Sequence, residues 1–217
     1  MSKSESAGAT TSSATPIPYW GLVLARAVVA AVAAIVVTFS ADHSAEFGLA
    51  VFGTFAVATG AVLIAGARSA VAPGIQRTIF VLQGIVGLAA GIAALSLAWL
   101  GLPLFILLVS SWAAITGFLE LYLGLRSRGR LEQARDWVFA GAFTALLAVV
   151  TILIPADFSQ AYTGPDKVER FLTAAVIIVG ALGAYGAILG IYLAIAALSL
   201  KWTTKAPVAA DVEGSSN

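Results

Sequence analysis

Three polar side chains interrupt long apolar stretches of this chain: Arg26, Gln83 and Glu120. Each lies six residues from a residue that marks the end of its stretch, namely Trp20, Arg77 and Arg126 respectively. In a helix six residues correspond to about 9 Å, so the three side chains are expected at one depth. Charged groups inside a membrane are candidates for ion pairs or for ion and solute paths. The sequence therefore predicts a buried polar layer.

Glu120 is expected to face Arg26 inside the protein. It follows Gly117 by three residues and precedes Gly124 by four, so all three share one helix face, which is rich in small residues. Two alternatives stay open. Arg26 and Glu120 can each reach independently toward the membrane surface, or they can line a proton or solute path.

The composition requires lipid as the solvent for most of the chain. Of its 217 residues, 60% are hydrophobic and 11% are charged, and the mean hydropathy is +0.97, whereas soluble domains are about a quarter charged. The net charge of +1 gives no electrostatic case for nucleic acid. The lipid bilayer is the expected partner.

The sequence predicts no cofactor and no catalytic set. The absence of cysteine excludes disulfides, thiolate metal sites and cysteine nucleophiles. The single histidine, His43, excludes a zinc site built from several histidines of one chain. No soluble small-molecule substrate is indicated, and the chain is expected not to be an enzyme.

Six stretches are long enough to cross a bilayer, which takes about 20 mostly apolar residues. They are continuously apolar without alternation, which favours helices over barrel strands. The fold class is therefore an all-α integral membrane protein with six helices, over Tyr19–Phe39, Phe47–Ala65, Thr78–Leu97, Pro103–Leu125, Trp137–Ile154 and Phe171–Leu200. The flanks, residues 1–18 and 203–217, are expected to be disordered cytoplasmic tails, because they are polar and lack apolar periodicity.

The connectors predict an orientation. Arginine gathers in the second and fourth connectors, at Arg68, Arg77, Arg126, Arg128, Arg130 and Arg135, and is absent from the first and third. The positive-inside rule then places both termini in the cytoplasm, and we expect a multi-pass membrane protein. Trp20, Trp137 and Trp202 are expected at the inner interface and Trp99 at the outer one, as an aromatic belt.

Two connectors allow a functional alternative. The first carries Asp42, His43 and Glu46, and histidine changes charge near neutral pH, so pH sensing is one interpretation and a solvated short loop the other. The arginine-rich fourth connector can attract anionic lipid headgroups, or it serves only as the topology signal.

A weak repeat appears at a step of 57 residues. Thr59–Gly60 aligns with Thr116–Gly117, and Arg26 aligns with Gln83 and then with Ala140. The repeat predicts three parallel helical hairpins, at about 19–66, 78–125 and 137–200, the third with a lengthened outer loop. Three such hairpins, with "GIVGLAAGIAAL" as a first helix and "TGFLELYLGLRSR" as a second, resemble the HdeD-like family of bacterial short-repeat membrane proteins. The resemblance implies a role in stress response, and in acid resistance in particular.

Glycines recur at helical spacing and are expected to pack helices closely, since small residues let membrane helices approach each other. The predicted packing positions are Gly60, Gly84, Gly87, Gly91, Gly117, Gly124, Gly186 and Gly190. Packing within the chain is one interpretation, and a homo-oligomer interface on the last span is the other.

The functional expectation is a non-enzymatic membrane protein, associated with stress or acid resistance through the family resemblance. One alternative is a small-solute or ion carrier, which would need several inward polar groups at mid-depth. Another is a membrane scaffold subunit of a larger complex, held through the glycine faces.

Overall fold

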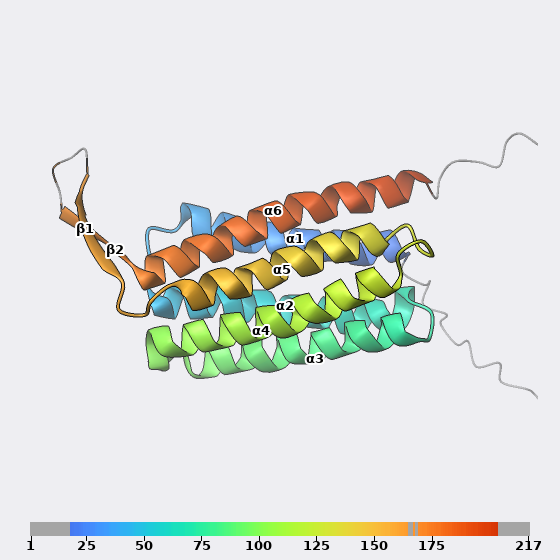
Figure 1. The fold of residues 1–217 in the computed structure, drawn as a ribbon, viewed down its shortest axis with the longest axis horizontal. Coiled ribbons are helices and arrows are strands. Elements are labelled where there is room, and N and C mark those ends of the chain that lie inside the picture. Colours follow the sequence, from blue (N-terminus) through green and yellow to red (C-terminus); the bar gives the residue numbers. More distant parts are fainter. Residues whose placement is uncertain (1–17, 165–166, 168, 204–217) are drawn as a thin grey trace, which may run out of the picture.

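The computed structural model describes residues 18–164, 167 and 169–203. Six helices lie side by side along the long axis, and a two-stranded hairpin projects from one end (Figure 1). All six helices are long and apolar enough to cross a membrane, so the protein is a multi-pass helical membrane protein. The two predicted disordered tails lie outside the described residues, apart from Pro18 and Thr203.

The helices are α1 Tyr19–Phe39, α2 Ala45–Ala70, α3 Ile75–Ser96, α4 Gly101–Arg126, α5 Ala134–Leu153 and α6 Ala174–Thr203, with a 3-10 turn at Ala98–Leu100. Each of the six predicted spans corresponds to a helix, and α1 has the predicted bounds. Gly101 and Gly129 adopt positive φ angles, at the start of α4 and in the turn after it, where glycine carries no steric cost.

The first connector serves the start of α2. The Ser44 side chain accepts a hydrogen bond from the Phe47 amide, as an N-cap does. The Ser44 amide in turn donates to the carboxylate of Asp42, while the His43 ring lies against Phe47. Asp42 and Ser44 thus order the start of α2, while pH sensing by His43 and a merely solvated loop both remain interpretations.

The connector between α5 and α6 contains strands β1 Ser159–Thr163 and β2 Glu169–Thr173, which pair antiparallel. The predicted start of the last span at Phe171 was therefore wrong: Phe171 lies in β2 opposite Ala161, and α6 begins at Ala174. Glu169 and Arg170 are charged and costly to bury in hydrocarbon, and the strand residues are mostly exposed.

The closest helix pairs are α2–α3, α4–α5 and α1–α6, rather than the two helices within each predicted hairpin. Small residues make the difference, because they allow backbone-to-backbone contact. A Cβ built on Gly60 would lie 2.6 Å from the Gly84 carbonyl oxygen, and one on Gly117 would lie 2.6 Å from the Ala145 amide nitrogen. Both positions therefore depend on glycine.

The other predicted glycines also lie at these crossings. Gly87 and Gly91 approach α2, Gly124 approaches Val138 on α5, and Gly186 and Gly190 approach α1. The glycine motif of α6 is thus occupied by α1 of the same chain. Gly180 differs, because nothing lies within 4 Å of a Cβ built there.

An aromatic cluster fills the middle of the bundle. Phe55 of α2, Trp112 of α4 and Tyr185 of α6 meet edge to face, with ring centroids 5.6 to 6.3 Å apart, which is a favourable ring geometry. The prediction that Trp137 lies in an aromatic belt at the membrane interface was wrong. Trp137 is 4% exposed, and its indole N–H donates to the Tyr19 hydroxyl, so it packs inside the bundle.

Candidate functional site: a buried polar layer

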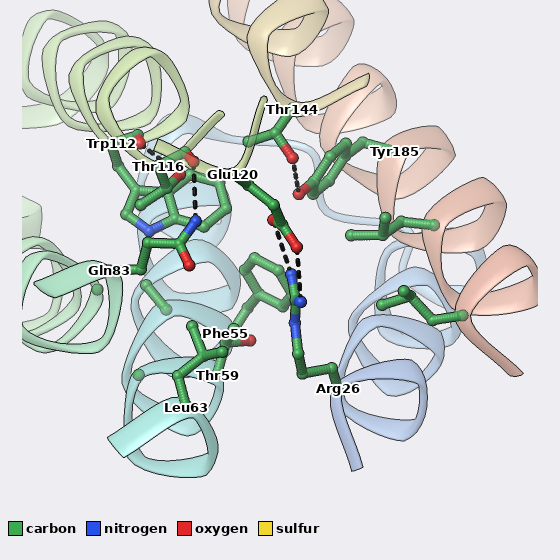
Figure 2. Close-up of a pocket in the computed structure, with 15 residues that line it drawn as sticks. Arg26, Phe55, Thr59, Leu63, Gln83, Trp112, Thr116, Glu120, Thr144 and Tyr185 are labelled. Carbon is green, nitrogen blue, oxygen red and sulfur yellow. Dashed lines mark hydrogen bonds and ion pairs between the residues drawn. The ribbon is translucent and has the colours of Figure 1, made fainter. Parts of the chain in front are cut away.

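Arg26 and Glu120 form a bidentate ion pair inside the bundle (Figure 2). The two guanidinium nitrogens of Arg26 donate to the two carboxylate oxygens of Glu120, at 2.7 and 3.0 Å. The side chains are only 10% and 4% exposed. Parallel bonds between a guanidinium and a carboxylate are the strongest arrangement for such a pair, so each charge is neutralised where it is buried.

The pair joins two helices that do not pack closely. Arg26 belongs to α1 and Glu120 to α4, whereas the close neighbour of α1 is α6 and that of α4 is α5. Gly117 and Gly124 bring α4 against α5, and Glu120 between them in sequence is directed into the interior. The long arginine side chain covers the remaining distance across the bundle.

Gln83 lies in the same layer but does not bond to the ion pair. Its side chain is 2% exposed, and its amide nitrogen donates to the Thr116 carbonyl oxygen at 2.9 Å. This bond ties α3 to α4. The three predicted side chains thus make two separate contacts with α4. Arg26 pairs with the Glu120 carboxylate, and Gln83 donates to the backbone carbonyl of Thr116, one turn earlier in the helix.

A third contact was not predicted from the sequence. The hydroxyls of Thr144 on α5 and Tyr185 on α6 lie 2.9 Å apart, and both residues are buried. The Thr144 hydroxyl also donates to the Ala140 carbonyl, so Tyr185 is the natural donor to Thr144. A tyrosine amid the apolar residues of α6 was the available signal, because a buried tyrosine hydroxyl usually finds a partner.

These groups surround a small cavity (Figure 2). Its lining includes Arg26, Thr59, Gln83, Glu120 and Tyr185, and the volume open to the centre of a water molecule is about 20 Å³. Among the described side chains, the Thr59 hydroxyl and the Gln83 amide oxygen are buried without a hydrogen-bond partner. Thr59 completes the layer on α2 and was not among the predicted site residues.

The chemistry open to this site is limited by its charges and size. The guanidinium and the carboxylate neutralise each other, so the layer offers no net charge to an ion. Within the described residues no group of three or more His, Asp or Glu side chains is placed to hold a metal. The cavity volume is sufficient for a water molecule.

Comparison of the chain with protein-family models, with curated proteins and with solved structures finds no match.

Proposed function

We propose that this protein is a non-enzymatic membrane protein of the bacterial cytoplasmic membrane with a role in stress resistance. The observation that carries the non-enzymatic part is the Arg26–Glu120 pair, in which the two buried charges satisfy each other. Each charged group is bonded to the other rather than held free for a substrate. The pair therefore supports a structural role across α1 and α4.

The stress role rests on the resemblance to the HdeD-like family. The test is a deletion strain challenged at several acid doses, with survival counted after each dose. Survival should fall in the deletion strain and return with the wild-type gene. Unchanged survival at every dose, with expression in the parent strain shown by immunoblot, would remove the stress role.

A three-hairpin repeat is part of the same proposal, and three sets of contacts support it. Gly60, Gly117 and Gly190 each approach a carbonyl oxygen and, four residues later, an amide nitrogen on the paired helix. The approached residues are Gly84 and Leu88, Gly141 and Ala145, and Ala27 and Ala31, respectively. Ala27, Gly84 and Gly141 follow each other at the 57-residue step. Gly190 comes later than that step because the β1–β2 segment intervenes.

The orientation with both termini in the cytoplasm is supported by the arginines between α2 and α3 and between α4 and α5. Arg77 also donates to the carbonyl oxygens of Ala67 and Arg68 in the last turn of α2, where a cation is favourable. Reporter fusions after Arg130 and after Trp202 should be cytoplasmic, and fusions after Glu46 and after Pro165 should be external. An external reporter after Arg130 would contradict the orientation.

A small-solute or ion carrier is the second candidate, and the unpartnered oxygens of Thr59 and Gln83 are the observation in its favour. A carrier would need a conformation in which the layer opens by more than the present cavity. Purified protein in liposomes should then carry a proton or cation flux that Glu120→Gln abolishes. A flux equal to that of empty liposomes would exclude this candidate for protons and for the cations tested.

A further inference from the structure

Two buried oxygen atoms of the polar layer lack a hydrogen-bond partner among the described residues. The Gln83 side chain is 2% exposed and Thr59 is 9% exposed, and neither the amide oxygen nor the hydroxyl oxygen makes a hydrogen bond to a described protein atom. A buried polar atom without a partner is costly, and such atoms in folded proteins usually bond to ordered water. The two oxygen atoms of Thr59 and Gln83 therefore require a partner that is not part of the described protein.

Both atoms belong to residues that line the same cavity, together with Arg26 and Glu120. Figure 2 shows Thr59 and Gln83 on one side of this space and the ion pair on the other. The volume open to a water centre is about 20 Å³, somewhat above the ~10–15 Å³ that one water molecule needs. Size and polarity thus agree on a single small occupant.

The donors and acceptors around the cavity define the chemistry of that occupant. The Gln83 amide oxygen can only accept a hydrogen bond, while the Thr59 hydroxyl can donate and accept. The occupant must therefore donate to Gln83, and it gains a second bond from Thr59 in either direction. A metal cation fits poorly, because the Glu120 carboxylate that could attract it is already neutralised by Arg26.

We propose that the cavity binds one water molecule, held by the Thr59 hydroxyl and the Gln83 amide oxygen next to the Arg26–Glu120 pair. Water supplies two donors and two acceptors, so it satisfies both protein atoms and has capacity left for the charged groups. It also links α2 to α3 inside the bundle, where no direct bond between these two side chains exists. The water site does not depend on the biological role proposed above.

The test measures contact between water and methyl groups by nuclear magnetic resonance, using the full chain in lipid nanodiscs with labelled alanine methyls. Ala56 lines the cavity and is fully buried, so its methyl should show a cross-peak at the water frequency in the wild-type protein. Thr59→Val removes the hydroxyl without changing the shape, and it should reduce this cross-peak severalfold. Gln83→Leu should do the same.

Thr151→Val is the matched control. Thr151 is also buried, but its hydroxyl already donates to the Leu147 carbonyl, and it does not line the cavity. This variant should leave the Ala56 cross-peak unchanged. The proposal is overturned if the wild-type protein lacks that cross-peak while methyls at the membrane surface show theirs. It is equally overturned if Thr59→Val, folded as judged by its methyl spectrum, keeps the full intensity.

Discussion

The glycine crossings and the Arg26–Glu120 pair hold the same bundle in opposite ways. At the crossings, such as Gly60 against Gly84, two neighbouring backbones approach each other directly, and the side chains of Ile64 and Leu88 pack beside them. The ion pair joins α1 to α4 through the full length of an arginine and a glutamate, between helices that do not pack closely.

The difference concerns how stability is distributed. Lipid provides no hydrophobic driving force between helices, so close packing has to hold them together. Several crossings occur along each closely packed helix pair, so each single crossing contributes only a small share of the packing energy. The ion pair is a single contact, and removing one partner leaves the other charge buried without compensation, which is strongly destabilising. Damage at the pair should therefore exceed damage at any one crossing.

The largest effect is expected from breaking the ion pair. Arg26→Gln or Glu120→Gln leaves the other charge buried without a partner, which costs about 3–5 kcal/mol in proteins. The free energy of unfolding in bicelles measures the loss. The double variant should lose less than the sum of the two single losses, because it strands no charge.

Arg128→Gln is the control for charge removal, since Arg128 lies exposed in the connector after α4. Its effect should stay within about 0.5 kcal/mol. If the two single losses at Arg26 and Glu120 add to within about 0.5 kcal/mol in the double variant, the two sites are uncoupled and the contact does not stabilise the protein.

A smaller loss is expected from overfilling one crossing. A Cβ on Gly141 would meet the backbone of Leu121 and the carbonyl oxygen of Gly117, so Gly141→Val must push α4 and α5 apart. Overpacking of this kind costs about 1–3 kcal/mol. The matched control is Gly180→Val, where open space surrounds the glycine. Equal unfolding free energies for the two variants would show that the α4–α5 contact is not close.

The smallest effect is expected at the neutral contact between Thr144 and Tyr185. Tyr185→Phe removes one buried hydrogen bond and should cost about 0.5–1.5 kcal/mol. In Tyr185→Phe, Thr144 keeps its bond to the Ala140 carbonyl. Thr144→Val and Tyr185→Phe both remove the same bond between the two hydroxyls, so the double variant should cost less than the sum of the two single variants. A loss from Tyr185→Phe as large as that from Glu120→Gln would contradict the ranking.

Much of the membrane bundle could be predicted from the sequence, because hydrocarbon imposes both span length and backbone satisfaction on each helix. The buried polar layer could be predicted from the sequence for the same reason. Arg26 and Glu120 stand out against apolar neighbours, and their distances from the span ends predict a common depth.

The rest depended on information that spacing does not carry. The spans could be counted, but helix neighbours follow from which small faces fit together, so the close pairing of α1 with α6 was not predicted. Thr59 and Thr144 look like any threonine in a helix, where the hydroxyl commonly bonds to its own backbone. The β1–β2 ribbon lies in a segment whose composition indicated only a long polar loop.

The pairing of α1 with α6 also sets an order of events during synthesis. Because α1 precedes α6 in the chain, it is made before its closest neighbour, against which Gly186 and Gly190 of α6 pack. Until α6 has been made, the small-residue face of α1 has to contact lipid or another protein that binds it transiently. Close packing of α1 therefore has to wait for α6, and truncation before α6 would leave α1 without its closest helix neighbour.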